Sequence, residues 1–203
     1  NIDAISEIAK KHGLPVVVDN TFGTPYLFRP LEHGANIVVH SATKFIGGHG
    51  TAIGGVIVES GKFPWDNGKF PTMTDPSPGY HGVRFFETFG DFGFTMKCRM
   101  EGMRTFGPVL APFSAFQLLQ GIETLPLRMD RHCSSALAVA RHLESHPKVA
   151  WVSYPGLESS PYHVLAKKYL PRGAGAVLSF GIRGAAAAGQ KFIDSVEFLS
   201  HLA

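Results

Sequence analysis

The sequence has little that would place the protein in a membrane or on nucleic acid. Its formal charge is only +3, and its lysines and arginines form no basic block that could follow a phosphate backbone. No apolar run approaches the ~20 residues that a membrane-spanning helix needs. Only two cysteines are present, Cys98 and Cys133, and they form no CxxC motif, so free thiols in a reducing compartment are expected. We therefore expect a cytoplasmic protein with no nucleic-acid and no membrane partner.

The chain is nevertheless large enough to fold around a substantial core. Its 203 residues, 44% of them apolar and 17% charged, suit one large domain or two small ones. An amphipathic helical pattern opens the sequence without a start methionine or a signal peptide, and Gly13 stands where a helix cap belongs. The sequence ends in an apolar stretch without a cap. We expect an internal excerpt of a longer protein.

Three short apolar runs predict buried strands of an open α/β sheet. They are LPVVVDN, which contains Asp19 near its end, ANIVVHSATK, which leads to Lys44, and GGVIVES. Runs that are apolar on both faces are typical of parallel sheets. In such sheets ligands bind beyond the carboxyl ends of the strands, which is where Asp19 and Lys44 both fall.

The segment 62–82 is rich in proline and glycine but also in aromatic residues. We expect a long ordered loop, because disordered segments contain few aromatic side chains. Helical periodicity returns over about 88–104 and again over 113–125.

A domain boundary is expected at Pro126, which suits the first turn of a new helix that runs to about His146. After this helix the pattern alternates strand, helix, strand and helix, which indicates a smaller α+β layer. The expected domains are therefore 1–125 and 126–203.

Lys44 lies in the segment HSATKFIGGHG, directly after the second apolar run. Most lysines are solvated surface charges, but this one follows a buried strand and lies beside Ser41, Thr43 and several glycines. One functional reading makes Lys44 the base of an S-x-x-K enzyme with Ser41 as its nucleophile. The S-D-N and K-T-G elements that accompany that motif are absent from the sequence.

The other functional reading makes Lys44 the amine that holds pyridoxal 5'-phosphate (PLP) as a Schiff base. This cofactor needs a lysine, a carboxylate at the pyridine nitrogen, and hydroxyls or backbone amides for its phosphate. Asp19, Ser41 and Thr43 could supply the last two at one edge of the sheet. Asp19 alone would fit a simple turn, but its pairing with Lys44 favours the cofactor.

The stretch VVVDNTFGTPYLFRPLEHGANIVVHSATKFIGGHG resembles the Cys/Met-metabolism family of PLP-dependent enzymes, and the resemblance continues through APFSAFQLLQGIETLPLRMDRH and VSYPGLESSPYHVLAKKYL. It implies the fold type I of PLP-dependent transferases, with a mainly parallel sheet in a three-layer α/β/α large domain and a smaller α+β C-terminal domain, both incomplete here. Residues 1–125 would be the C-terminal part of the PLP-binding domain. The resemblance implies Lys44 as the cofactor lysine, Asp19 as partner of the ring nitrogen, Ser41 and Thr43 as phosphate ligands, and Thr21 beside the ring.

Within this family, GGHGTAIGG after the lysine and the long aromatic loop resemble the O-acetylhomoserine sulfhydrylases. That implies γ-replacement, in which O-acetylhomoserine and sulfide or a small thiol give homocysteine or methionine and acetate. A γ-lyase, a cystathionine γ-synthase or a non-catalytic fragment remain alternatives. The resemblance also implies a homotetramer made of two dimers. It places the ring-stacking tyrosine and a Gly-rich phosphate turn before residue 1, and the arginine for the substrate carboxylate after residue 203.

Two residues depart from the family pattern, Asn36 and Ser114, and both are interpreted as structural caps. The remaining polar candidates receive structural interpretations as well. His142 and His146 have a spacing that could bind zinc but lack a third ligand nearby, so a solvated helix face is expected. His40 is expected to pack at a strand end and His49 to shape the loop after Lys44. The cysteines are expected in helix cores or boundaries, and Arg99, Arg104 and Arg128 in surface ion pairs.

Overall fold

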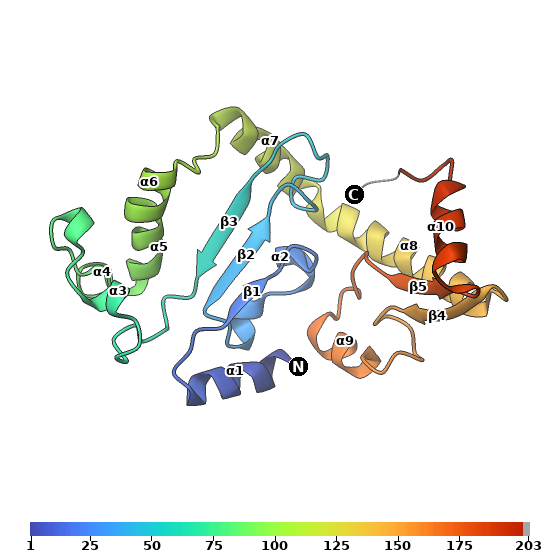
Figure 1. Cartoon of the computed structure of the whole chain (residues 1–203), viewed down its shortest axis with the longest axis horizontal. Coiled ribbons are helices and arrows are strands. Elements are labelled where there is room, and N and C mark those ends of the chain that lie inside the picture. Colours follow the sequence, from blue (N-terminus) through green and yellow to red (C-terminus); the bar gives the residue numbers. More distant parts are fainter. Residues whose placement is uncertain (201–203) are drawn as a thin grey trace. The chain divides into compact units, whose positions relative to one another are not determined.

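The computed structural model, which describes residues 1–200, contains two units, Asn1–Pro126 and Leu127–Ala203 (Figure 1). The first unit is built on a sheet of β1 (Val17–Asp19), β2 (Ile37–Ser41) and β3 (Gly55–Glu59), in the order β1-β2-β3. Strands therefore lie where the three apolar runs predict them.

The strands do not all run in the same direction. β1 pairs parallel with β2, whereas β3 pairs antiparallel with β2 in a register that places Ser41 opposite Gly55. A parallel return would need a long crossover, usually a helix. The connection between β2 and β3 contains no helix, so β3 turns back beside β2 and the described sheet is mixed.

Burial is also less even than predicted. In β2, Ile37 and Val38 are buried, but Val17 of β1 is 54% exposed and Ile57 of β3 is 52% exposed. β1 and β3 are the two edges of the sheet as described, so each has a strand neighbour on one side only. The expectation of strands buried on both faces is met by the central strand alone.

Short helical segments connect the strands. Helix α1 (Ile2–Lys11) precedes β1 and is capped by Asn1, whose side chain accepts a hydrogen bond from the Ala4 N–H, and Gly13 follows the helix with a φ of +57°. The predicted first helix is thus confirmed. Between β1 and β2 lie α2 (Thr24–Leu27) and the 3₁₀ helix η1 (Pro30–His33).

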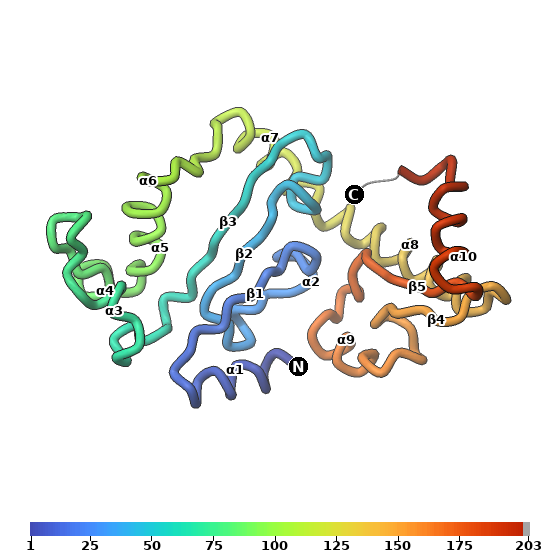
Figure 2. Tube along the Cα trace, viewed as in Figure 1, coloured from blue at the N-terminus to red at the C-terminus, as the bar shows by residue number. Residues whose placement is uncertain are grey.

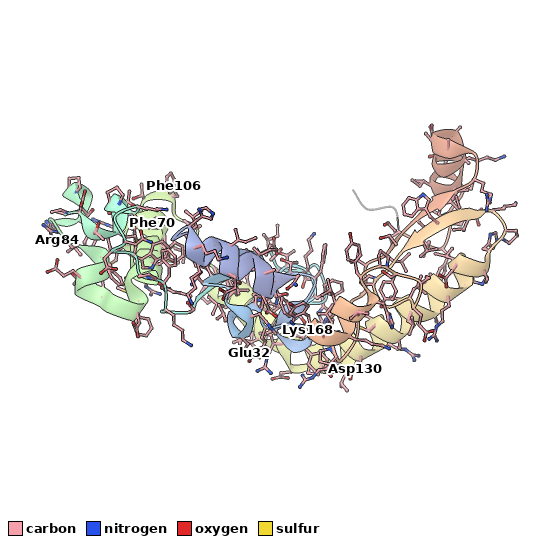
Figure 3. The ribbon with its side chains drawn as sticks, turned by 90° about the horizontal axis from the view of Figure 1, so that it is seen from below. Glu32, Phe70, Arg84, Phe106, Asp130 and Lys168 are labelled. Atoms are coloured by element: carbon pink, nitrogen blue, oxygen red, sulfur yellow. The ribbon has the colours of Figure 1, made fainter. Side chains whose placement is uncertain are left out.

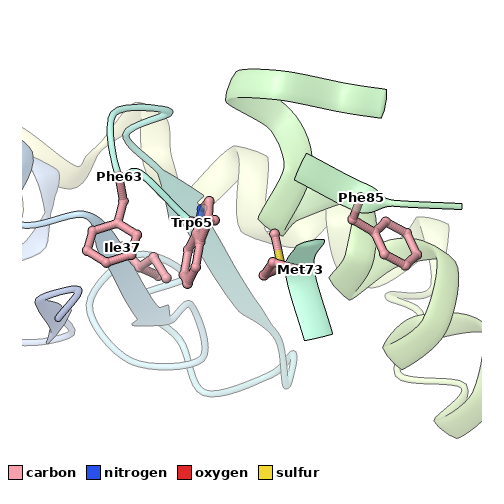
Figure 4. Close-up of a cluster of buried hydrophobic side chains, with 5 residues drawn as sticks. All are labelled: Ile37, Phe63, Trp65, Met73 and Phe85. Carbon is pink, nitrogen blue, oxygen red and sulfur yellow. The ribbon is translucent and has the colours of Figure 1, made fainter. Parts of the chain in front are cut away.

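The aromatic segment after β3 packs against one face of the sheet. It contains α3 (Pro71–Thr74) and η2 (Pro78–Tyr80), and its cluster of buried side chains is shown in Figure 4: Ile37, Phe63, Trp65, Met73 and Phe85. Figure 3 labels Phe70, whose ring contacts those of Phe63 and Trp65, and two exposed residues of the same unit, Arg84 and Phe106. The predicted loop is therefore a packed part of the core.

The helix predicted over 88–104 is interrupted. The segment comprises α4 (Phe85–Phe89), the 3₁₀ helix η3 (Gly90–Phe92), α5 (Gly93–Lys97), the π-helix η4 (Cys98–Met103) and α6 (Arg104–Phe106). The break falls at Gly90, whose φ of +53° is incompatible with a continuing right-handed helix. Helix α7 (Pro112–Glu123) ends this part of the chain and agrees with the predicted helix over 113–125.

The second unit is an α+β layer. It contains most of α8 (Leu125–Ser145), then β4 (Val149–Ser153), α9 (His163–Tyr169), β5 (Ser179–Ile182) and α10 (Ala185–Asp194), and β4 pairs antiparallel with β5. The last predicted helix ends at Asp194, earlier than expected, and its predicted final residues 201–203 lie outside the described part. Across residues 1–200, no helix combines the length and apolarity that crossing a bilayer requires.

Candidate functional site

The carboxyl ends of β1 and β2 lie side by side. Asp19 closes β1 and is in register with Val39, while Ser41 closes β2 two residues further along. Side chains alternate between the two faces of a sheet, and residues in register share a face. The Asp19 carboxylate and the Ser41 hydroxyl therefore project from the same face.

Thr21 joins these two strand ends. Its backbone N–H donates to Oδ1 of Asp19 at 3.0 Å, and its hydroxyl oxygen accepts a hydrogen bond from the Ser41 N–H at 2.8 Å. The Thr21 hydroxyl, followed by its N–H, holds the pKa of the exposed Asp19 carboxyl below its ordinary value. This edge of the sheet thus presents an ionised carboxylate at neutral pH.

The segment 42–54, which we name the lysine loop, follows β2 as a series of tight turns. The Gly47 N–H donates to the Ala42 carbonyl and the Gly48 N–H to the Lys44 carbonyl, both at 2.8 Å. Thr43 closes the loop, because its hydroxyl donates to the Gly54 carbonyl at 3.3 Å and accepts from the Gly54 N–H at 3.0 Å. These hydrogen bonds within the loop stabilise its conformation.

The Lys44 side chain is exposed on this loop. Among residues 1–200, neither the Lys44 amine nor the Ser41 hydroxyl has a hydrogen-bond or ion-pair partner. Both groups are therefore free to react with or bind a small molecule. The structure joins Asp19, Thr21 and Ser41 by hydrogen bonds and leaves the Lys44 amine outside that network.

Polar side chains on the other face of the sheet near the site are buried. His40 is 8% exposed at the end of β2, as predicted, and burial lowers the pKa of its imidazole. Asn20, which follows Asp19, is buried, and its amide donates to the carbonyls of Thr24 and Phe28 at 3.1 and 2.8 Å. These bonds fix the turn that begins directly after Asp19. The Asn following the strand-end Asp was the sequence signal for this turn.

Helix α7 is a part of the site that the sequence did not indicate. Leu118 of α7 is buried against Ala42, Ile46 and Ala52 of the lysine loop, so this helix packs on the loop that carries Lys44. Figure 2 shows the tube of the lysine loop turning beside α7. The helical periodicity of apolar residues in α7 predicts a helix but does not predict which segment that helix contacts.

The structural interpretations of most other candidates agree with their surroundings. Oδ1 of Asn36 accepts a hydrogen bond from the Val16 N–H at 2.9 Å, and the ring Nδ1 of His49 lies 2.8 Å from the Gly47 carbonyl oxygen. Ser114 lies in the first turn of α7, but the N-cap of that helix is Ala111, so the expected cap is not formed by Ser114.

The structure also places the two histidines that were not expected to bind zinc and the two cysteines. The ring centroids of His142, in the last turn of α8, and of His146, the residue directly after this helix, are 5.8 Å apart, and the described residues include no group of three or more metal-binding side chains. Cys98 and Cys133 are both free thiols, and burial raises the pKa of each.

Comparison with known proteins identifies the family of this chain. Residues 1–203 match the family described as Cys/Met metabolism PLP-dependent enzyme. The chain is 52% identical over 212 residues to the O-acetyl-L-homoserine sulfhydrylase of Leptospira meyeri and 54% identical over 206 residues to the homocysteine synthase of Schizosaccharomyces pombe. In both cases all of this chain and 48% of the relative are covered, so the chain spans about half the length of these curated relatives.

A solved structure extends the likeness to the fold. A protein of Campylobacter jejuni described as an O-acetylhomoserine (thiol)-lyase, with N'-pyridoxyl-lysine-5'-monophosphate in its chain, superposes with a TM-score of 0.93 at 36% identity. The match covers 100% of this chain and 50% of that one. The fold is thus the type I fold of PLP-dependent transferases, as the sequence predicted. The chain belongs to the Cys/Met metabolism family of PLP-dependent enzymes.

Proposed function

We propose that this chain carries the lysine-bearing part of a PLP site and that Lys44 holds the cofactor. The observation that carries the proposal is the edge formed by β1 and β2. There an ionised Asp19 and a Ser41 hydroxyl without a partner among the described residues share one face, and an unpaired Lys44 amine follows on the next turn. Bound PLP supplies an aldehyde that reacts with amines and a ring that withdraws electrons from the substrate α-carbon.

Each residue has a distinct role in this proposal. The Asp19 carboxylate would hold the ring nitrogen of PLP in its protonated form. Thr21 holds that carboxylate in position through its hydroxyl and N–H. With PLP and substrate bound, the Lys44 amine would take the proton from the substrate α-carbon.

The hydroxyls of Ser41 and Thr43 are proposed to donate to the cofactor phosphate. Ser41 can do so directly, because its hydroxyl has no other partner among residues 1–200. The Thr43 hydroxyl would exchange its long bond to the Gly54 carbonyl for a shorter, charge-assisted bond to phosphate. It would keep the Gly54 N–H as its donor, so the loop would stay closed.

The reaction proposed for the whole protein is γ-replacement on O-acetylhomoserine. The thiolate of sulfide or of a small thiol forms a bond to Cγ, acetate leaves from the same carbon, and the products are homocysteine or methionine and acetate. The names of the Leptospira relative, an O-acetyl-L-homoserine sulfhydrylase, and of the Schizosaccharomyces relative, a homocysteine synthase, support this substrate and this product. Elimination by a γ-lyase, which would release 2-oxobutanoate and ammonia, and cystathionine γ-synthesis are the competing outcomes.

The two units are proposed to be pieces of two domains. Residues 1–125 would be the C-terminal part of the PLP-binding domain and residues 126–203 the start of the smaller domain. We further propose a homotetramer in which dimers share active sites, with the ring-stacking tyrosine and the substrate-binding arginine supplied outside these 203 residues. The two free cysteines support the proposed cytoplasmic location.

A product assay on the full-length protein tests the function. With PLP, O-acetylhomoserine and sulfide, we expect homocysteine and acetate in equal amounts and little 2-oxobutanoate. Omission of sulfide should stop acetate release. The Lys44→Ala variant should lose activity, whereas Lys62→Ala, a change of an exposed lysine on the aromatic segment, should keep it. Production of 2-oxobutanoate in place of homocysteine would identify a lyase, and activity in Lys44→Ala would contradict the assignment of the lysine.

A further inference from the structure

Helix α7 touches the backbone of the lysine loop at Gly121. A Cβ atom at this position would lie 2.3 Å from the carbonyl oxygen of Gly47 and 2.6 Å from that of Ile46. Ordinary contacts of a Cβ atom begin at 3.4 Å. No side chain fits at Gly121, because the helix backbone and the loop backbone are in direct contact.

Two glycines of the loop also pack closely against α7. A Cβ atom on Gly47 would lie 2.8 Å from Cδ2 of Leu118, and one on Gly54 would lie 2.8 Å from Cδ1 of the same leucine. Leu118 therefore fits between Gly47 in the middle of the loop and Gly54 at its end. Gly47 does not have a positive φ, so close packing and not backbone conformation explains the glycine there.

Two hydrogen bonds connect this contact to the lysine. The Gly47 N–H donates to the Ala42 carbonyl, and the next N–H, that of Gly48, donates to the carbonyl of Lys44 itself, both at 2.8 Å. Ala42 is 1% exposed and Ile46 5% exposed, so the turn cannot move outward without opening the packed cluster. A displacement of Gly47 must therefore pass to the backbone of Lys44.

We propose that Gly121 is a positioning residue for Lys44. It lets α7 set the position of the lysine loop, and through the loop the position of the Lys44 amine. This inference rests on the proposed role of Lys44 in holding PLP. It adds that a residue remote in sequence, which contacts neither cofactor nor substrate, fixes the geometry of the reacting amine.

The expected size of the effect follows from the contact distance. An alanine at position 121 would require helix and loop to separate by about 1 Å, from 2.3 Å to an ordinary contact. A misplacement of about 1 Å at a reacting group can cost about 100-fold in rate. Gly189 provides a matched control, because it lies inside α10 and a Cβ atom there would meet nothing within 4 Å.

The test compares Gly121→Ala with Gly189→Ala in the full-length PLP-loaded protein. For Gly121→Ala we expect a kcat about 100-fold lower, a changed pH dependence of the visible absorption band of the lysine-bound cofactor, and faster amide hydrogen exchange over residues 42–54. The Gly189→Ala variant should match the wild type in all three. Equal spectra and equal exchange in both variants would overturn the proposal, even if both lose some activity.

A second variant covers the case in which Gly121→Ala fails to fold. Leu118→Ala adds no atom and removes the side chain that fits between Gly47 and Gly54. It should accelerate exchange over residues 42–54 and slow borohydride trapping of the cofactor on Lys44. Unchanged exchange and trapping would overturn the proposal. The wild-type trapping in the same experiment tests the role of Lys44 separately, so absence of a wild-type adduct would contradict the proposed function itself.

Discussion

The Ser41 N–H donates a hydrogen bond of 2.8 Å to the hydroxyl of Thr21. This bond crosses from the turn after β1 to the last residue of β2, and Thr21 also bonds the Asp19 carboxylate. One threonine thereby connects the residue proposed for the ring nitrogen with a residue proposed for the phosphate. We expect the spacing between the two ends of the proposed cofactor site to depend on this side chain.

Replacement of Thr21 by valine should loosen this connection. Valine keeps the shape of threonine and the backbone N–H that donates to Asp19, but its side chain can neither accept from the Ser41 N–H nor bond the Asp19 carboxylate. We expect the loss of these two side-chain bonds to lower the affinity for PLP about tenfold. Thr21→Ser keeps the hydroxyl and should bind PLP nearly as the wild type does. Titration of the apoprotein with PLP gives both affinities, and equal affinities of the two variants would contradict the role of the hydroxyl.

The Asp19 carboxylate should contribute to stability only above acidic pH. Thr21 lowers the pKa of Asp19 in the folded state below its unfolded value of about 4. The contribution is therefore present above that unfolded pKa and is lost as the pH falls through the folded pKa. The melting temperatures of wild type and Asp19→Asn should converge as the pH is lowered from 6 to about 3. A difference that is constant with pH would contradict the bonding to Thr21.

The two tryptophans should differ sharply in their contribution to stability. Trp65 is 5% exposed within the aromatic cluster, so Trp65→Ala should lower the free energy of unfolding by about 3–5 kcal/mol. Trp151 is 55% exposed on β4, and Trp151→Ala should cost about 1 kcal/mol. Urea unfolding of both variants measures the difference. Similar losses would mean that the aromatic segment is not part of the core.

Tyr154 should make the protein sensitive to alkali. Its buried hydroxyl donates to the Gly175 carbonyl at 2.9 Å, and burial raises the pKa of Tyr154 to about 12. Because this folded value lies above the unfolded value of about 10, the stabilisation is complete below pH 10 and is lost as the pH rises toward 12.

Tyr154→Phe tests this explanation. It should lower stability by about 1–2 kcal/mol at neutral pH, because the Gly175 carbonyl loses its donor. It should also remove the loss of stability between pH 10 and 12. Chemical unfolding across this range measures both effects, and an equal alkaline loss in the variant would assign it to another group.

Much of the fold follows from local sequence patterns. Apolar runs locate β1, β2 and β3, and the spacing of apolar residues with Pro126 locates α7 and α8. Direction and burial of the outer strands do not follow, because they depend on connections and neighbours that a run of valines does not specify. The helix is interrupted at Gly90 because this residue has a positive φ, and an amphipathic pattern does not predict backbone dihedral angles.

The candidate site was predictable to a similar extent. Asp19 ends β1 and Lys44 follows the end of β2 by three residues, so the parallel pairing of these strands explains why both lie near one edge of the sheet. The contact of Gly121 with Gly47 was not predictable, because it joins residues far apart in sequence through the absence of side chains. Such contacts leave no periodic signal.

Borohydride reduction tests whether Lys44 forms the covalent bond to PLP. The full-length protein is incubated with PLP, reduced, digested and mapped by mass spectrometry. We expect a pyridoxyl adduct on Lys44 in the wild type and in Lys62→Ala, and none at this peptide in Lys44→Ala. A wild-type protein without an adduct on Lys44, or an equal yield of adduct from Lys44→Ala, would contradict it.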